Sequence, residues 1–392
     1  MTTRRLRWGL VGGGHGAFIG AVHRMAARLD DRYELVAGAL SSTAERSLAS
    51  GRELGLAQAR NYPSYREMAA SEAARKDGIQ VVSIVAPNDV HYDAAKTFLE
   101  AGIDVICDKP LVTELAQALT LVKSVRQYDR VFVVTYNYTG YPLVRQAREM
   151  VAAGEIGEIR LVQVEYLQSW LTEKLEDSGN KQALWRTDPA RSGPGGCLGD
   201  IGTHAFHLAG FVTGLDATEI SAQLDTFVPG RRLDDNVRIM MRYPNGAQGM
   251  LWASQVTPGH ENDLRLRVYG SKGSLSWAQE RPNALAFARL GQPTQYLTRG
   301  GPSLGPAAAS ATRIPAGHPE GYLEAFAQLY KDAADLIAAR AKGRDPAASS
   351  QREPAFLPGV IDGAKGVKFI ATAVESSRAG GSWRPVSLAS GA

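Results

Sequence analysis

The sequence of 392 residues predicts an α/β fold with a doubly wound parallel sheet, followed by an α+β domain with a large, open, mostly antiparallel sheet. Up to about residue 138, continuous apolar segments alternate with segments of helical periodicity, as in a parallel sheet covered by helices on both faces. Beyond that point, apolar and polar residues alternate within several segments, which is typical of half-buried antiparallel strands. The length suits two cores, so we expect domains at residues 1–138 and 139–392.

The elements of the first domain follow one another at short intervals. The apolar segments predict strands over residues 7–14, 33–40, 59–62, 79–86, 103–108 and 130–136. Between them, apolar residues recur with helical spacing over residues 18–29, 44–54, 90–102 and 114–127. The short strand at 59–62 is expected to end at Pro63, because proline has no N–H to donate to a neighbouring strand.

The second domain is expected to contain strands over residues 158–170, 217–228, 236–244, 247–255 and 264–270. Asn245 and Gly246 lie between two of these strands, and an Asn-Gly pair is typical of a tight hairpin turn. Residues 300–318 are rich in Gly, Pro, Ala and Ser and predict a mobile loop. A long amphipathic helix is expected after this loop, from about Pro319 to Ala341.

Composition argues against several classes of function. The 44 basic and 40 acidic residues are dispersed, and a net charge of +4 without a basic block argues against a nucleic-acid partner. Since no segment is apolar for long enough to span a bilayer, we expect no membrane partner. Cys107 and Cys197, the only cysteines, are too few for a disulfide scaffold or a cysteine-built zinc site. A cytoplasmic location is the expectation.

A glycine-rich turn after the first strand forms a recognisable motif. Gly12, Gly14 and Ala17 match the pattern G-x-G-x-x-A, placed between a strand and a helix. In that setting the first glycine permits the turn, the second lets the backbone approach a pyrophosphate, and the alanine allows helix and strand to pack closely. The turn therefore predicts a dinucleotide site of the Rossmann type. The neighbouring residues expected to contribute to it are His15, Gly16, Phe18 and Ile19.

The end of the second strand bears on the choice between NAD and NADP. Enzymes that bind NAD usually place Asp or Glu there, where the acid binds the ribose diol. Here the chain carries Ser41 and Ser42, with Arg46 one turn later and no acid at the expected position. Small hydroxyls beside an arginine leave room for a 2′-phosphate, so these residues alone favour NADP weakly.

Two further segments end at the carboxyl edge of the sheet, where such folds bind ligands. Ala86, Pro87 and Asn88 follow one strand, and we expect the last two to line the nicotinamide ribose. His91 is a further candidate contact, although it fits a residue at the start of a helix better than a ligand. After the next strand, Lys109 either caps a surface turn or lies beside a reacting group.

A second constellation of polar residues lies in the second domain. If residues 200–207 are helical, Asp200 and His204 share a face and His207 follows three residues later. The preferred interpretation is a general acid–base pair, because a carboxylate can fix the tautomer of an adjacent imidazole and raise its basicity. The alternatives are a metal site made of these three residues and a histidine buried in the core. We expect no metal, since no other cluster in the sequence supplies ligands.

Taken in this order, the segments resemble the Gfo/Idh/MocA oxidoreductases. That family carries a glycine turn near its start, an E-K-P motif after the fifth strand and G-G-x-x-x-D-x-G-x-H in its second domain. The matching positions here are Gly12, Gly14, Ala17, Asp108, Lys109, Pro110, Gly195, Gly196, Asp200, Gly202 and His204. The resemblance runs along nearly the whole chain, with Asp108 in place of the usual Glu, Ala86 in place of a common Thr and His207 in place of a frequent acid.

Within the family, the segments GGGHGAFIGAVHR, NYTGYPLVRQAREM, QALWRTDPARSGPGG and GRRLDDN resemble the branch that contains levoglucosan dehydrogenase. The resemblance implies NAD as the cofactor, against the weak indication from Ser41 and Ser42. It also implies oxidation of a secondary hydroxyl of a cyclic sugar or polyol to a ketone, at C3 in levoglucosan. The alternatives are an inositol dehydrogenase, a redox glycosidase acting through a 3-keto intermediate, and a nucleotide sensor without activity.

The resemblance further implies roles for the matching residues. Lys109 would stabilise the oxyanion or carry its proton, His204 would be the general base, and Asp200 would orient His204. Asp108, Lys109 and Asn137 are candidate cofactor contacts. A homodimer or homotetramer is expected, because an open sheet commonly pairs with its copy.

The substrate is expected to lie between the two domains. Besides the three implied catalytic residues, the candidate contacts are Asn137, Tyr138, Tyr141, Trp185 and Arg186. An aromatic plane suits the apolar face of a sugar, whereas Arg and Asn suit its hydroxyls. Trp185 as a core anchor and Tyr138 as a packed hinge residue are the structural alternatives. His318 and Tyr322 are candidates for closing over the site or for contacting a neighbouring subunit.

Overall fold

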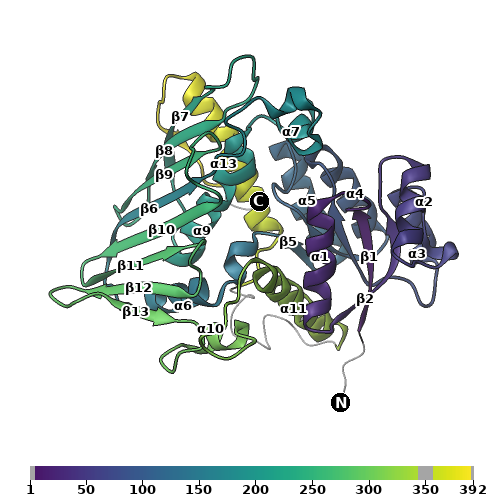
Figure 1. Ribbon diagram of the computed structural model, residues 1–392, viewed down its shortest axis with the longest axis horizontal. Helices are drawn as coiled ribbons and strands as arrows, with labels where there is room; N and C mark the ends of the chain where they lie inside the picture. The colour runs from purple at the N-terminus through teal and green to yellow at the C-terminus, as the bar shows by residue number, and fades with distance from the viewer. Residues whose placement is uncertain (1–4, 343–355, 390–392) are drawn as a thin grey trace.

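The computed structural model describes residues 5–342 and 356–389, and within these ranges the chain forms two sheets (Figure 1). The first is a five-stranded parallel sheet in the order β2-β1-β3-β4-β5. Its strands are β1 (Leu6–Gly12), β2 (Tyr33–Ala39), β3 (Val81–Val85), β4 (Asp104–Cys107) and β5 (Phe132–Val134). Every residue of β3, β4 and β5 is buried, so the continuous apolar segments form the covered parallel sheet that they predicted.

The strand expected at residues 59–62 is wrong. Gln58–Arg60 forms a 3-10 turn, and an isolated bridge between Gly38 and Asn61 connects this segment to β2. Side chains hold the segment in place instead of a strand ladder. Arg60 pairs with the buried Glu72, and the Asn61 amide donates to the carbonyl of Leu48 at 2.8 Å.

Helices cover both faces of the first sheet. α1 (Phe18–Leu29) lies on one face, α4 (Asn88–Glu100) and α5 (Leu115–Tyr128) lie on the other, and α2 (Ala44–Glu53) lies beside β2. α3 (Tyr65–Ala73) is an addition to the expected helices. It follows Ser64, whose hydroxyl oxygen accepts a hydrogen bond from the N–H of Glu67 at 3.2 Å. A serine before the first turn is a capping signal that the sequence already contained.

A helix from late in the chain completes one of these layers. α11 (Tyr322–Ala341) packs against α1 (Figure 1). Tyr330 belongs to the core between these helices and the sheet. The helix begins at Tyr322 rather than near Pro319. Glu320 precedes the helix, and its carboxylate pairs with the buried Arg299 at 2.8 Å. Residues 300–318, expected as a mobile loop, contain the short helix α10 (Pro306–Ala311).

The second sheet has nine strands in the order β13-β12-β11-β10-β6-β9-β8-β7-β14. All its pairs are antiparallel except β6 with β9. The expected strands are present as β6 (Ile159–Leu167), β7 (Glu219–Asp225), β8 (Asn236–Arg242), β9 (Gln248–Ser254) and β10 (Asp263–Gly270). The remaining strands are β11 (Gly273–Ala278), β12 (Ala284–Arg289), β13 (Gln295–Thr298) and β14 (Arg384–Pro385).

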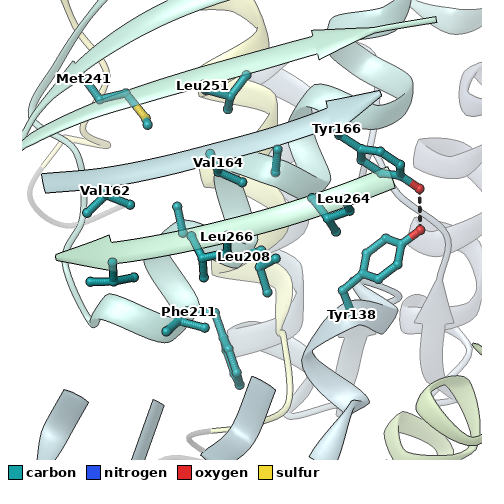
Figure 2. Packing of buried hydrophobic residues seen from close by; sticks show 14 of the residues in the cluster. Tyr138, Val162, Val164, Tyr166, Leu208, Phe211, Met241, Leu251, Leu264 and Leu266 are labelled. Carbon is teal, nitrogen blue, oxygen red and sulfur yellow. Dashed lines mark hydrogen bonds between the residues drawn. The ribbon is translucent and has the colours of Figure 1, made fainter. Parts of the chain in front are cut away.

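One face of the second sheet is covered and the other is open. α6 (Pro142–Ala152), α9 (Thr203–Thr213) and α13 (Val360–Arg378) pack on the covered face. Figure 2 shows the core there, with Leu264 and Leu266 of β10 beside Val162 and Val164 of β6. Across the ranges that the structure describes, no helix is long and apolar enough to cross a membrane.

Candidate active site

The glycine turn between β1 and α1 leaves no room for side chains at two positions. Gly12 has a φ of +75°, and a Cβ there would lie 2.6 Å from the carbonyl oxygen of Val85. A Cβ on Gly14 would lie 2.6 Å from the carbonyl oxygen of Leu40, which accepts the Gly14 N–H at 3.1 Å. The turn is therefore held against the carboxyl ends of β2 and β3, where the motif predicted a dinucleotide.

The start of α1 suits a phosphate group. Ala17 is the N-cap and its side chain makes no capping hydrogen bond, so the first N–H groups of the helix are not satisfied by a cap. A cavity of about 400 Å³ lies here, lined in part by Gly14, His15, Gly16, Ala17 and Phe18. The His15 ring is exposed and lies 3.1 Å from Glu53. Ile19 lies in the first turn of α1 and is partly buried. These residues fit a dinucleotide.

The residues expected to select the cofactor lie next to this turn. Ser41 is half-buried after β2, whereas Ser42 and Arg46 are exposed. Two nearby hydroxyls have a structural function: that of Ser47 accepts from the Leu40 N–H and donates to the carbonyl of Tyr62, and that of Ser50 accepts from the His15 N–H. Ser42 and Arg46 therefore remain accessible to a ribose or its phosphate.

The segment after β3 is anchored by two side chains that were candidate cofactor contacts. Ala86 and Pro87 are half-buried, and the buried Asn88 donates through Nδ2 to the carbonyl of Ser192 at 2.9 Å. The ring nitrogens of His91 lie 3.0 Å from the carbonyl oxygen of Pro110 and 2.8 Å from that of Ala86. His91 thus connects the segments after β3 and β4, which supports its structural interpretation.

Lys109 and Asp200 lie together where the two halves of the chain meet. The Lys109 ammonium lies 3.0 Å from Asp200 Oδ1 and also donates to the backbone carbonyl of Asp200. Oδ2 of the same carboxylate accepts from Gln255 at 2.9 Å and lies 3.3 Å from Arg186 Nε. Burial raises the pKa of Asp200, but attraction to Lys109 and Arg186 outweighs it and holds the pKa well below its usual range.

The expectation that Asp200 orients His204 is wrong for this structure. The carboxylate is directed at Lys109, Arg186 and Gln255, while the buried Nδ1 of His204 has no hydrogen-bond partner among the described residues. The physical reason is local. Residues Leu198–Gly202 form a π-helix, so Asp200 and His204 are not separated by the regular α-helical turn that the spacing argument assumed.

His204 lies in an aromatic enclosure. Its ring packs edge-on to Tyr138 at 4.9 Å and to Tyr136 at 5.7 Å between centroids, and the residue is 7% exposed. Burial, reinforced by repulsion from Lys109, lowers the pKa of His204 well below its ordinary value. His204 is therefore neutral near pH 7 and able to accept a proton.

His207 has a different environment. Its ring stacks on Tyr136 at 4.1 Å, and Nε2 lies 4.0 Å from a carboxylate oxygen of Asp362. Burial lowers the pKa of His207 to about 4. Asp200 and His207 have different partners, and across the described residues these three side chains do not form a group that could hold a metal ion, which argues against the alternative of a shared metal site.

The candidate substrate contacts divide into two groups. Asn137 is buried in the turn Asn137–Gly140, and its Nδ2 has no partner among the described residues. Arg186, on α7 (Lys181–Arg186), stacks over the Trp185 ring at 4.2 Å while reaching Asp200. Arg186, with Trp185 against its guanidinium, therefore borders the Lys109–Asp200 pair, and Asn137 carries an unused donor.

The two tyrosines belong more to the core. Figure 2 shows the hydroxyls of Tyr138 and Tyr166 directed at each other, and they are hydrogen-bonded. Tyr141 stacks parallel to Tyr138 and is 2% exposed. The packed interpretation of Tyr138 is therefore supported. Of the two residues expected to close the site, His318 is exposed, whereas Tyr322 is partly buried and packs on Phe326 at 5.1 Å.

Several side chains at this site were missed. Gln255 Nε2 lies 3.3 Å from Gln168 Oε1, and Gln168 in turn donates to Asn262 at 2.7 Å, which also accepts from Tyr166 at 2.8 Å. These amides lie at or just beyond the ends of β6, β9 and β10 and continue the polar network from Asp200 to the tyrosines. Their only sequence signal is a polar residue directly before or after an alternating strand.

Asp234, also missed, holds the segment that carries Asp200. Its carboxylate accepts from the N–H groups of Gly196 and Leu198, each at 2.7 Å. Burial raises its pKa to about 6, although these hydrogen bonds oppose that shift. The carboxylate thus fixes the glycine-rich entry to the π-helix.

Comparison with known proteins agrees with this geometry. Residues 6–149 match the family model described as an oxidoreductase family with an NAD-binding Rossmann fold, and residues 144–276 match the GFO/IDH/MocA C-terminal domain. The chain belongs to the GFO/IDH/MocA family. It is therefore an oxidoreductase with an NAD-binding Rossmann fold, and the resemblance found in its motifs is confirmed.

Three similar proteins place the chain within the family. The uncharacterized oxidoreductase YfiI of Bacillus subtilis is 36% identical over 97% of each chain. An inositol dehydrogenase homolog from Azotobacter vinelandii, solved with NADH and myo-inositol, is 38% identical with a TM-score of 0.90 and covers 98% of each chain. Levoglucosan dehydrogenase, solved with NADH and levoglucosan, is 26% identical with a TM-score of 0.81, covering 98% of this chain and 100% of the other.

Proposed function

We propose that this protein oxidises a secondary hydroxyl of a cyclic sugar or polyol to a ketone and transfers the hydride to NAD. The observation that carries the proposal is the pair of Lys109 and Asp200, 3.0 Å apart at the carboxyl edge of the first sheet, beside a buried and neutral His204. The glycine turn, which we propose holds the cofactor, lies at the same edge of the sheet.

The proposed roles follow from the state of each group. NAD supplies the hydride acceptor, held by the glycine turn and the segments after β2, β3 and β4. His204 accepts the hydroxyl proton, because its ring is neutral. The Lys109 ammonium stabilises the alkoxide that develops as the proton leaves. Asp200 holds Lys109 in place and keeps its own negative charge.

The preference for NAD over NADP is part of the proposal. Ser42 and Arg46 would tolerate a 2′-phosphate, but Ser41 and Ser42 also offer hydroxyls to the ribose diol of NAD. The inositol dehydrogenase homolog and levoglucosan dehydrogenase were both solved with NADH. NADP is the competitor that a kinetic comparison must include.

Two substrate classes fit the polar surroundings. An anhydrosugar such as levoglucosan, oxidised at C3, would place its hydroxyls against Lys109 and Arg186 and its apolar face near Trp185. An inositol isomer is the second candidate. It is favoured by the higher identity to the inositol dehydrogenase homolog, 38% against 26% for levoglucosan dehydrogenase.

The purified protein should be mixed with NAD or NADP and a panel of levoglucosan, myo- and scyllo-inositol, glucose and simple glycosides. The expected result is formation of NADH with NAD and at least one cyclic polyol or sugar. Disappearance of a glycoside without net NADH would favour the redox glycosidase, which oxidises C3, eliminates, adds water and reduces again. Binding of NAD with no turnover of any compound would favour the sensor.

The proposal also includes self-association and a cytoplasmic location. The open face of the second sheet exposes large apolar side chains: Leu161, Met240, Met250, Trp252 and Tyr269. They lie on one face of adjacent strands, which suits pairing with a second copy into a dimer or tetramer. Cys107 and Cys197 are free thiols, as a reducing compartment would keep them.

A further inference from the structure

A line of hydrogen bonds through the first sheet and its covering helices ends at Asp108. Trp8 Nε1 lies 2.9 Å from Ser83 Oγ, which lies 2.7 Å from the hydroxyl of Tyr330. That hydroxyl lies 2.7 Å from His23 Nδ1, and His23 Nε2 lies 3.0 Å from Asp108 Oδ1. The members come from β1, β3, α11, α1 and the end of β4, so the line connects a late helix to the segment after β4.

The chemistry of the groups gives this line a direction. The indole N–H of Trp8 can only donate, so Ser83 accepts from it and donates its own hydrogen to Tyr330. Tyr330 then donates to Nδ1 of His23, and His23 carries its proton on Nε2 and donates to Asp108. In this arrangement every hydrogen of the line has an acceptor. A ring protonated on both nitrogens would leave one hydroxyl hydrogen, that of Ser83 or that of Tyr330, without an acceptor among the described residues.

The line is shielded from water, which makes each link necessary. Trp8, Ser83, Tyr330 and His23 are each at most 1% exposed. Burial raises the pKa of Tyr330, so its phenol remains a donor. An unpaired polar group in such surroundings is costly, and the loss of one link leaves its neighbours unsatisfied.

Asp108 is held by two donors at once. Besides His23, the hydroxyl of Thr135 donates to the same Oδ1 at 2.6 Å. Burial raises the pKa of Asp108, but the interaction with His23 and these hydrogen bonds more than offset this and lower it. Asp108 directly precedes Lys109 in the chain, so a carboxylate that lost its donors would have a neighbouring ammonium as an alternative partner.

We propose that His23 and Tyr330 are positioning residues for the oxidation proposed above. By giving Asp108 a fixed donor, they keep its carboxylate from competing with Asp200 for Lys109. The ammonium then stays on Asp200, where the alkoxide develops. The inference rests on the proposed function. It assigns α11 an indirect effect on the reaction, because Tyr330 of this helix contacts His23 and His23 contacts Asp108.

Two measurements test this inference. In the first, Tyr330→Phe removes the donor to His23 with little change in shape. We expect kcat to fall about tenfold, while KM for the sugar and Kd for NADH stay within about twofold. His23→Ala should lower kcat at least as much. His23→Gln keeps an amide donor and should therefore retain a higher kcat than His23→Ala.

The matched control is Tyr33→Phe. Tyr33 belongs to the same buried aromatic cluster, 5.1 Å from the Tyr330 ring, and its hydroxyl donates to the Tyr330 backbone carbonyl rather than to the line. Its loss should lower stability and leave kcat unchanged. Equal losses of kcat in Tyr33→Phe and Tyr330→Phe would overturn the inference, as would a Tyr330→Phe variant with unchanged kcat.

The second measurement does not need turnover. Nitrogen-15 NMR of the histidine-labelled wild-type protein should show His23, one of 7 histidines, protonated on Nε2 with Nδ1 as an acceptor. A proton on Nδ1, or on both nitrogens, would overturn the inference even if Tyr330→Phe does not fold. If no sugar or polyol is oxidised but the NMR result holds, the proposed function fails and the hydrogen-bond line stands.

Discussion

Lys109 and Asp200 are joined twice, because the ammonium of Lys109 bonds both the carboxylate of Asp200, at 3.0 Å, and its backbone carbonyl. Lys109 follows β4 of the first sheet, and Asp200 lies in the π-helix before α9 in the second half of the chain. Each side chain is less than one fifth exposed, at 17% and 18%. The pair therefore fixes the two halves at the point where we place the reaction.

Replacing Lys109 separates charge stabilisation from proton transfer. Lys109→Ala should lower kcat by about 10²- to 10³-fold, because the alkoxide loses its nearest cation. Lys109→Arg keeps the charge but cannot give up a proton at ordinary pH. If His204 is the base, the Lys109→Arg variant should have a kcat at least about ten times that of Lys109→Ala. Equal kcat in both variants would instead assign the proton to Lys109, and NADH binding serves as the control for folding.

His204→Gln should lower kcat by about 10²- to 10⁴-fold and change the pH profile. The base must be neutral, and its pKa is lowered by burial and by Lys109, so wild-type kcat should decline only as the pH falls below the ordinary range of histidine. The residual activity of His204→Gln should lack this acid limb. An unchanged limb in the variant would assign it to another group.

His207 should make the protein less stable in acid. The pKa of His207 is lowered to about 4 in the folded state from an ordinary value of 6.5, so the unfolded chain takes up the proton first. The stability contribution of the neutral ring is complete above pH 6.5 and is lost as the pH falls toward 4, by at most about 3 kcal/mol. Urea denaturation at several pH values should show a shallower loss for His207→Gln. His318→Gln, at an exposed position, is the control and should follow the wild type.

Removing the Asp234 carboxylate should loosen the entry to the π-helix. Asp234→Ala leaves the N–H groups of Gly196 and Leu198 without their acceptors and should lower the free energy of unfolding by about 1–3 kcal/mol near pH 8. We also expect kcat to fall, because Asp200 follows in the same segment. The control is Glu219→Ala, which removes an exposed pair with Arg242 and should cost less than about 1 kcal/mol. A similar loss in both variants would contradict this role of Asp234.

The sequence was informative where chemistry depends on local pattern. The glycine turn, the strand before it, the helix after it and the pairing of β8 with β9 follow from spacing and turn residues alone. Lys109 became a candidate through its place after a strand and His204 through its spacing from Asp200, and the resemblance implied their roles. The structure places Lys109 on Asp200 and encloses His204 among tyrosines. Ser64 was an available cap signal for α3.

The remaining features depend on tertiary contacts. The expected pairing of Asp200 with His204 assumed α-helical spacing, whereas Leu198–Gly202 forms a π-helix. Composition does not predict a π-helix at this position. Gln168, Gln255 and Asn262 come from three segments that meet only when the second sheet forms. Arg60 and Asn61 do not form the expected third strand. Their side chains instead bind Glu72 and the carbonyl of Leu48, contacts that the short apolar pattern did not indicate.

The position of α11 has a consequence for the order in which the protein is made. β5 ends at Val134 and α11 ends at Ala341, so roughly 200 residues must be translated before the helix can cover its face of the first sheet. At typical rates of synthesis this takes on the order of ten seconds or more. During that time a nascent chain exposes Leu10, Val81 and Ile106, which α1 and α11 bury in the finished protein. Chains that stop before α11 should therefore aggregate or depend on chaperones, even though they contain every strand of the NAD-binding sheet.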